Sequence, residues 1–390
     1  MKYSVIITTT RPRLLDYALR SAVTQDYDDY EVVVSDNSDE GCRELVERIG
    51  DARVRYVRPD DHLPLVDHWD SAFAQARGDW HMLLCDDDAV TPNLLSAVDA
   101  RLAAHSDVES VSWNQGVYIG DAGWGDLMQH RRLGVSPYTG TLTVYDSAAL
   151  LEDMFASGTG LFRVKWRLPF FPRTAVRRDV LDAIRERQGQ LFHRYCPMTS
   201  GALATLAFSK RSLHIDLPLR VLGLTVDSCA GWVVDPETMD TSHASPKIEL
   251  APIKLFNMMP TAQTDSMLRT QQALPELLGQ YEVNYVNYFL ACELFIQEIE
   301  GQGFDTTVYR AHFDEALVKM PGDVQAATRQ AIAAEATTPS AVQRAREAVS
   351  RLVARLRPPR LPGEVDAARL GLNDIFDCAA YVGDMIEHRA

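Results

Sequence analysis

Short apolar runs alternate with helix-like segments along the first 115 residues, and this alternation constrains the fold more than any other feature. The run Val32-Val33-Val34 is continuous, as in a strand covered on both faces. Thr91 followed by Pro92 is a typical helix start. We expect strands over residues 4–8, 30–35, 54–57, 80–85 and 108–113, and helices over 12–25, 42–49, 65–76 and 91–104. This order predicts an α/β fold with a mostly parallel, doubly wound sheet that binds ligands beyond the carboxyl ends of its strands.

The rest of the chain has a different pattern. Residues 116–250 are less regular, with glycine-rich and aromatic loops at 116–125 and 157–172. Beyond residue 250 the pattern becomes helical, with long amphipathic segments at 283–299 and 341–356. A proline-rich breaker at 357–363 precedes a last helix. We therefore expect three parts, residues 1–115, 116–250 and 251–390, of which the last is a helical C-terminal region.

The charge balance restricts the partners. A net charge of −15 opposes binding to nucleic acid or to anionic lipid, so an anionic ligand would need local positive charge. The most apolar later stretch, Val221 to Val234, is interrupted by Asp227 and is too short to span a bilayer. The six cysteines are scattered without metal-ligand spacing, which favours free thiols in a reducing compartment. We expect a cytoplasmic protein with no leader peptide, no integral membrane segment and no nucleic-acid partner.

The run Asp86-Asp87-Asp88 directly follows the buried-strand signal Met82 to Cys85. Three adjacent carboxylates repel one another, and a divalent cation with oxygen ligands would offset that repulsion. In an extended segment alternate side chains share a side, so Asp86 and Asp88 would point together and Asp87 elsewhere. A solvated acidic turn is the simpler alternative, but the position at the predicted ligand edge favours a Mn²⁺ or Mg²⁺ site that also binds a diphosphate.

Several segments, taken together and in order, resemble the GT-A glycosyltransferases of family 2. They are Ser4-Val5-Ile6-Ile7-Thr8-Thr9-Thr10-Arg11, Asp36-Asn37-Ser38 and Ala76-Arg77-Gly78-Asp79-Trp80, followed by Asp86-Asp87-Asp88. The resemblance covers about the first 115 residues. It implies a Rossmann-like GT-A domain, with the nucleotide-sugar half in residues 1–115 and the acceptor half in 116–250.

The resemblance also implies roles for individual residues. Asp36 would accept a hydrogen bond from the base, typically uracil, Asp86 would face the ribose, and Asp88 would be the main metal ligand. Asp86 is the second candidate ligand, and His243 resembles a late histidine that completes the metal site in some relatives. The donor-binding set that we expect comprises Thr8, Thr9, Arg11, Asp36, Asn37, Arg77, Asp86 and Asp87.

The catalytic base is the least defined part of the prediction. Inverting family members use a carboxylate to deprotonate the acceptor hydroxyl, and no clean copy of their Glu-Asp motif is present. Asp227, which lies between apolar runs, and Asp153 are the candidates that we select. Other acids and a histidine stay open, as does stacking of an acceptor on the aromatic loop with Tyr118 and Trp124. These other candidates are Glu152, Asp179, Asp216, Asp235 and His193.

The sequence thus predicts a metal-dependent glycosyltransferase that moves a sugar from a nucleotide-diphospho-sugar, such as a UDP-sugar, to an acceptor hydroxyl. The resemblance alone implies inversion. The acceptor would be a small molecule or an oligosaccharide, and the C-terminal helices could form a homo-oligomer. Two alternatives stay open. A sugar-phosphate nucleotidyltransferase would need a glycine-rich loop where Thr8-Thr9-Thr10-Arg11-Pro12 stands, and a non-catalytic binding protein would explain the missing base motif.

Overall fold

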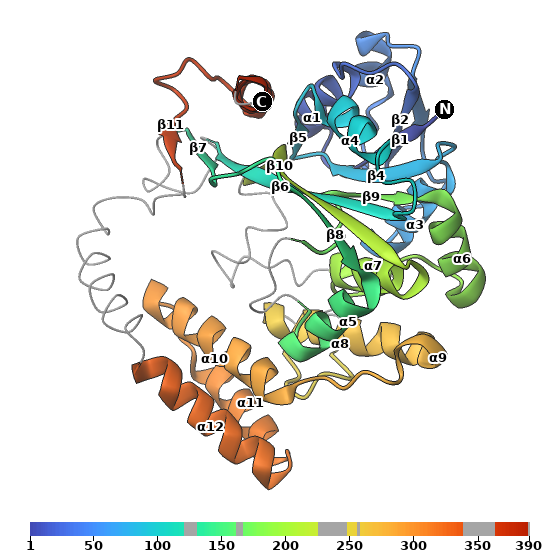
Figure 1. Ribbon diagram of the computed structural model, residues 1–390. Helices are drawn as coiled ribbons and strands as arrows, with labels where there is room; N and C mark the ends of the chain where they lie inside the picture. Colours follow the sequence, from blue (N-terminus) through green and yellow to red (C-terminus); the bar gives the residue numbers. More distant parts are fainter. Residues whose placement is uncertain (121–130, 161–166, 225–247, 256–257, 338–362, 389–390) are drawn as a thin grey trace.

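The computed structural model describes residues 1–120, 131–160, 167–224, 248–255, 258–337 and 363–388. Eleven strands within these residues form one mixed sheet (Figure 1). They are β1 (Tyr3–Thr9), β2 (Tyr30–Asp36), β3 (Val54–Val57), β4 (Trp80–Cys85), β5 (Ala89–Val90), β6 (Ser110–Ile119), β7 (Arg132–Val135), β8 (Leu142–Asp146), β9 (Thr174–Arg177), β10 (Arg211–Leu224) and β11 (Val365–Asp366).

The helices cover both faces of this sheet and extend below it in the view of Figure 1. The described ones are α1 (Pro12–Val23), α2 (Arg43–Ile49), α3 (Leu65–Ala74), α4 (Leu94–Leu102), α5 (Ser147–Ser157), α6 (Arg178–Gln188), α7 (Pro197–Phe208), α8 (Met259–Ala273), α9 (Pro275–Leu278), α10 (Tyr285–Gln302), α11 (Thr307–Val318), α12 (Gly322–Thr337) and α14 (Ile375–Glu387).

The first four strands confirm the predicted α/β order. They lie parallel in the order β4-β1-β2-β3, and every residue of β1 and β2 is buried. The register pairs Thr9 with Asp36 on one side and Thr8 with Cys85 on the other. The polar residues that end these strands therefore come together at one edge of the sheet, as expected for a doubly wound fold.

Beyond β4 the sheet differs from a simple alternation. The short strand β9 lies between β4 and β6 and is antiparallel to both. We did not predict it, because four residues with two apolar members, Ala175 and Val176, are too few to show a period of two. Strand β6 continues to Ile119, well past the predicted end, where it pairs with β7 and β10.

Alternate residues of the central strands pack into two apolar cores. Val5 and Ile7 contact the core beneath α1, α4 and α14, whereas Ile6 contacts the core beneath α3 and α5 to α8. Each buried aliphatic side chain contributes about 1.5–3 kcal/mol to the stability of the fold. Helices thus pack on both faces of the sheet whose strand ends bring the polar residues together.

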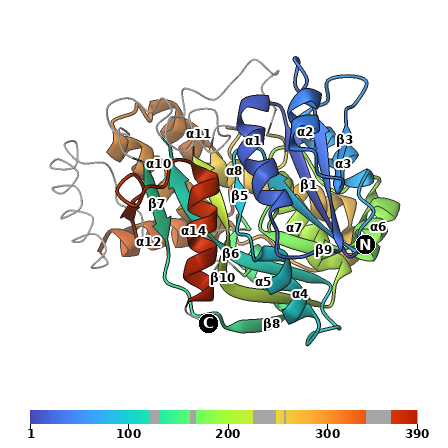
Figure 2. The same ribbon diagram turned by 90° about the horizontal axis from the view of Figure 1, so that it is seen from above.

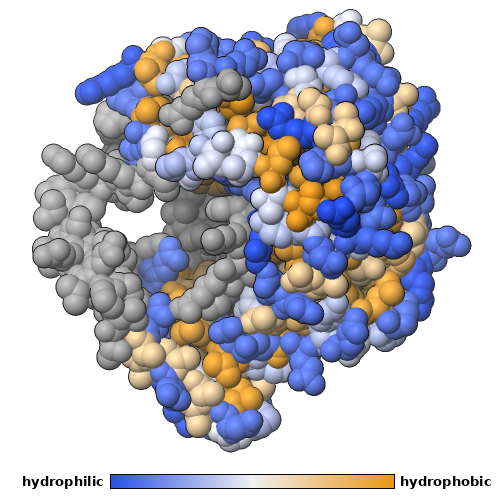
Figure 3. Space-filling view, in the orientation of Figure 1, coloured by the Kyte–Doolittle hydropathy of each residue, from blue (hydrophilic) through white to orange (hydrophobic). Residues whose placement is uncertain are grey.

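The C-terminal part adds a third apolar cluster, centred on α10 and α11. Helix α10 confirms the helix predicted over 283–299, whereas the one predicted over 341–356 lies outside the described residues. Hydrophilic side chains cover most of the face seen in Figure 3, and apolar ones gather in separate patches. Among the described residues, no helix has both the length and the apolar character that crossing a bilayer requires. The five cysteines described there are free.

The last helix returns to the N-terminal half of the molecule. Figure 2 shows α14 beside α1 and β5, and its contacts are with α1, β5, β6 and β10. The amide of Asn93 donates to the Gly383 carbonyl at 3.3 Å, and the Tyr138 hydroxyl donates to the Met385 carbonyl at 3.0 Å. This helix therefore packs against the paired strands β5 and β10, next to the turn that carries the aspartates.

Candidate active site

The first strand and the fourth strand bring Thr9, Arg11 and Asp86 into contact. The Thr9 hydroxyl donates to Asp86 at 2.8 Å, and the Arg11 guanidinium donates to the same carboxylate through Nε at 3.3 Å and through Nη2. Asp86 is almost fully buried. Burial raises the pKa of Asp86, while the neighbouring Arg11 opposes that rise. The predicted grouping of these three residues is therefore present.

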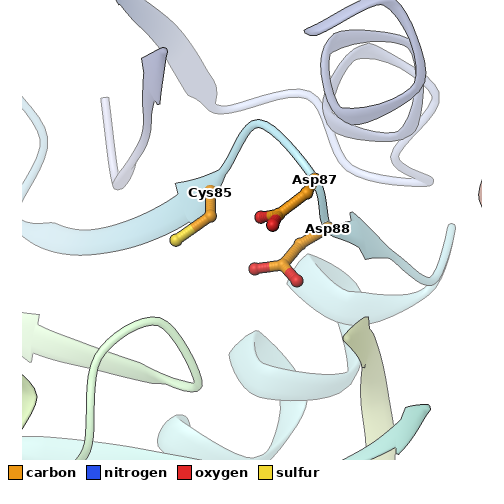
Figure 4. A group of neighbouring side chains, drawn as sticks. All are labelled: Cys85, Asp87 and Asp88. Carbon is orange, nitrogen blue, oxygen red and sulfur yellow. The ribbon is translucent and has the colours of Figure 1, made fainter. Parts of the chain in front are cut away.

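The aspartate run itself is a turn rather than an extended strand. Strand β4 ends at Cys85, and residues 86 and 87 reverse the chain toward β5. Strict alternation therefore does not apply, and our expectation that Asp87 would point away from Asp88 is wrong. Figure 4 shows Asp87 and Asp88 directed to the same side as Cys85, and ligand atoms of these three residues lie within 4.8 Å of one another.

This set of ligand atoms fits a divalent cation. Two carboxylates supply hard oxygen ligands, and the Cys85 sulfur adjoins them as a softer one. Burial raises the pKa of the Cys85 thiol well above its ordinary value, with the three aspartates adding to the rise. The thiol is therefore protonated in the ion-free protein, and the two carboxylates are the stronger ligands.

A residue that the sequence analysis missed lies against Asp88. Arg220, on β10, donates to one Asp88 oxygen through Nε at 3.1 Å and through Nη2, while the Gly223 N–H donates to the other oxygen at 3.2 Å. Both side chains are buried, with 5% of Arg220 and none of Asp88 exposed. Burial raises the pKa of Asp88 to about 6, although Arg220 opposes the rise.

A signal for Arg220 was present in the sequence. It lies in the apolar strand Leu217 to Val221, and an arginine that is buried in a strand needs a carboxylate or another acceptor.

Arg11 also approaches Asp87, at 3.4 Å. Three carboxylates thus face two guanidinium groups, which leaves one net negative charge at the turn.

Asp36 ends β2 and is completely buried. Its carboxylate accepts five hydrogen bonds, two from Ser38 at 3.0 and 2.6 Å, and one each from Cys42 at 2.8 Å, Tyr56 at 2.6 Å and Arg58 at 2.9 Å. Burial alone would raise its pKa, but the bonds from Ser38, Tyr56 and Cys42 outweigh burial and leave the pKa below its ordinary value. Since a carboxylate offers about four lone-pair sites, the oxygens of Asp36 are fully used.

Asn37 closes a neighbouring loop. Its amide donates to the Leu63 carbonyl at 2.8 Å, and its oxygen accepts from the Leu63 N–H at 2.9 Å. These two bonds hold residues 58–62 over the end of β2 and enclose a small pocket of about 170 Å³. This pocket is lined by Asp36, Asn37, Ser38, Asp39, Arg58, Pro59, Asp60, Asp61 and His62.

Arg77 and Thr8 differ in position from the remaining predicted residues. Arg77 precedes β4, so it lies at the amino end of that strand, whereas Asp86 follows the carboxyl end. Its backbone N–H donates to Ser4 and Glu31 there. The structure therefore does not bring Arg77 to the aspartate turn, because the whole length of β4 separates them. Thr8 does lie at the correct edge, buried between Ser35 and Cys85.

The candidate bases are dispersed. Asp153 lies on α5, half exposed and paired with Arg167, and α5 packs against α7 and β8 rather than against β4. Asp216 accepts from Thr139 and Asn114, and Asp179 pairs with Arg177 at 2.6 Å. Of the other candidates, Glu152 lines an open surface groove, Tyr118 is buried, and burial lowers the pKa of His193 to about 4. Asp227, Asp235, His243 and Trp124 lie outside the described residues.

One comparison, with known protein families, agrees with the resemblance that the motifs carry. Residues 4–157 match the model of the family described as "Glycosyl transferase family 2". Among solved structures, S. aureus TarS 1–349 in complex with UDP-GlcNAc aligns at a TM-score of 0.47 and 14% identity, over 85% of this chain and 92% of that one. The mannosyltransferase PcManGT from Pyrobaculum calidifontis, in complex with GDP-Man and Mn²⁺, aligns at 0.42 and 16%, over 82% and 86%.

No curated protein sequence matches the chain. The family match includes β1, β2 and β4 together with the Asp86–Asp88 turn, so it covers the strands that position the site. It favours glycosyl transfer over the nucleotidyl transfer that the sequence left open. Residues 4–157 therefore match the glycosyltransferases of family 2, and the observed α/β sheet agrees with that match.

Proposed function

We propose that this glycosyltransferase moves a sugar from a nucleoside-diphospho-sugar to an acceptor hydroxyl with the help of Mn²⁺ or Mg²⁺ held at the aspartate turn. One observation carries the proposal. The register of β1, β2 and β4 gathers Thr9, Arg11 and the three aspartates at a single sheet edge, where the described turn retains net negative charge. A cation and a nucleoside diphosphate together complete that charge pattern.

Each residue at the edge has a distinct task in this proposal. Asp88 and Asp87 would hold the cation, and Asp86 keeps Arg11 in place beside the sugar-diphosphate. The cation supplies Lewis-acid stabilisation of the departing diphosphate. The exposed part of Arg11 can donate to a phosphate oxygen, since 20% of its side chain is accessible. His243 stays a prediction as a further ligand.

The donor base would lie in the pocket beside Asp36. Because the Asp36 oxygens already accept five hydrogen bonds, we assign that carboxylate to holding Arg58 and Tyr56 in place at the pocket. Arg58 is 38% exposed and can donate to a carbonyl oxygen of the base. Thr8 and Asn37 shape the surrounding loops.

Inversion at the anomeric carbon requires a carboxylate on the face opposite the leaving group. Asp227 stays our candidate for that base, because Asp153 is paired with Arg167 on a different element. The acceptor is a small molecule or an oligosaccharide in this proposal. A homo-oligomer would use the C-terminal helices, where Val308 and Val318 of α11 expose large apolar side chains.

A thermal-shift screen tests the donor and metal site. Purified protein is melted with UDP, GDP, ADP or CDP, each with Mn²⁺, with Mg²⁺ or with EDTA. We expect one or a few nucleotides to raise the melting temperature only when the metal is present, because the two ligands complete one site. Asp88→Ala and Asp87→Asn should abolish that rise, each measured against its own ligand-free melting temperature.

Asp107→Ala is the matched control, since Asp107 is an exposed aspartate that pairs with Arg211 and makes no contact with the aspartate turn in that pair. This control should respond to ligands as the wild type does. Nucleotide release from the matching sugar donor then reports transfer or hydrolysis. A full metal-dependent response in both Asp88→Ala and Asp87→Asn would contradict the assigned metal ligands.

A further inference from the structure

Asp88 already has a cationic partner in the metal-free protein. Arg220 donates twice to one of its oxygens, and a third guanidinium contact, from Nη1, joins Arg220 to Gln115 on β6. Arg220 and Asp88 are both buried, and Gln115 is partly buried. A divalent cation that used Asp88 fully would therefore compete with this guanidinium for the same carboxylate.

We propose that Arg220 is an exchangeable partner of Asp88, which leaves the carboxylate when a divalent cation arrives and then donates to the diphosphate of the donor. This inference rests on the proposed metal-dependent function and assigns a further residue to it. Arg220 would keep its hydrogen bond to Gln115 during this exchange, so its side chain would stay attached to β6. A phosphate oxygen beside a cation at Asp88 would be its new acceptor.

The electrostatics favour this exchange over simple displacement. Leaving a buried guanidinium without its carboxylate and without a new acceptor is strongly destabilising. A second buried arginine, Arg173, lies close by. Burial and the nearby charge of Arg220 lower the pKa of Arg173 to about 9. Once a cation neutralised Asp88, the positive charges of Arg220 and Arg173 would no longer be offset by that carboxylate, and an anion with several acceptor oxygens would relieve their repulsion.

The consequence is a coupling between metal and nucleotide. The cation alone must break the Arg220–Asp88 pair, so it binds weakly to the free protein. The nucleoside diphosphate gives Arg220 a new partner, so it strengthens cation binding, and the cation strengthens nucleotide binding by the same factor. Removal of Arg220 should therefore change the two affinities in opposite directions.

The test measures Mn²⁺ binding from the EPR signal of free Mn²⁺, with and without UDP or GDP, whichever the thermal-shift screen selects. Arg220→Gln should bind Mn²⁺ alone about ten-fold more tightly than the wild type, because the competing guanidinium is gone. In the presence of saturating Mn²⁺ it should bind the nucleotide about ten-fold more weakly. Arg220→Lys keeps a positive charge on a single donor nitrogen, so its affinities for Mn²⁺ and for the nucleotide should lie between those of the wild type and of Arg220→Gln.

Arg211→Gln is the control on the same strand, since Arg211 pairs with the exposed Asp107. It should leave both affinities unchanged. If Arg220→Gln does not fold, the test uses Arg220→Lys together with the change in Mn²⁺ affinity that the nucleotide causes in the wild type. Equal Mn²⁺ affinity of the wild type with and without nucleotide, or a joint loss of both affinities in either variant, would overturn the exchange. Absence of any nucleotide or Mn²⁺ binding in the wild type would instead overturn the proposed function.

Discussion

Gly223 gives the sharpest test of how the aspartate turn is positioned. A Cβ at this residue would lie 1.8 Å from the carbonyl oxygen of Asp87 and 3.0 Å from Cδ1 of Ile375 on α14. Non-bonded heavy atoms pack at about 3.5 Å. The change Gly223→Ala would therefore push β10 and the turn apart by about 1.7 Å and weaken the bond from the Gly223 N–H to Asp88.

The size of the effect follows from this geometry. Overpacking costs about 1–3 kcal/mol, and the upper end applies because the obstacle is backbone rather than the end of a flexible side chain. For 390 residues the unfolding entropy is about 0.8 kcal/mol per kelvin. A loss of 3 kcal/mol in the free energy of unfolding then lowers the melting temperature by about 4 °C. The response to metal and nucleotide should fall more steeply, because Asp87 and Asp88 move directly.

Differential scanning fluorimetry measures both quantities on the same sample. Gly322→Ala is the matched control, because Gly322 begins α12 and no atom lies within 4 Å of its virtual Cβ. Alanine in that helix should leave the melting temperature unchanged or raise it slightly. The reasoning fails if Gly223→Ala melts with the wild type and retains the full metal-dependent shift.

Two further predictions concern buried titratable groups. Asp36→Asn removes the acceptor for the Cys42 N–H and the Tyr56 hydroxyl, so the free energy of unfolding in urea should fall by about 3 kcal/mol, while Asp39→Asn at an exposed position should change it little. A loss below about 1 kcal/mol would show that the network can rearrange. Burial lowers the pKa of four imidazoles to about 4, so the folded state resists their protonation and stability falls as pH drops from about 6.5 toward 4. The four residues are His68, His81, His193 and His214, and each lowers the free energy of unfolding by about 1 kcal/mol at pH 5.5. NMR titration of their ring protons should show no inflection above pH 5. Titration of these rings near pH 6.5 would refute the prediction.

The N-terminal half of the fold was predictable because its signals are local. Strands β1, β2 and β4 are continuous apolar runs, and each is followed by a polar cluster. The rule that parallel strands end at one edge then placed Thr9, Asp36 and the aspartates together, as the register confirms. Helices such as α1 followed from Pro12 and the apolar spacing behind it.

The remaining features depend on contacts between distant parts of the chain. Strand β9 pairs with β4 from almost a hundred residues away, and α14 packs onto β10 and α1 from the end of the sequence. Arg58 approaches Asp36 only because β3 lies beside β2. Arg77 shows the converse error, since we expected it in the donor-binding set although it lies at the amino end of β4, away from the aspartates.

The aspartate run shows where charge reasoning from sequence is sound and where it is incomplete. Three adjacent carboxylates do need cations, and the structure supplies two of them from Arg11 and Arg220. The two arginines differ, since 20% of the Arg11 side chain is exposed and only 5% of Arg220. Arg11 can therefore contact a ligand from the solvent side, whereas Arg220 is buried and joins β10 to the turn, so the exchange proposed above would require another cation to take its place at Asp88.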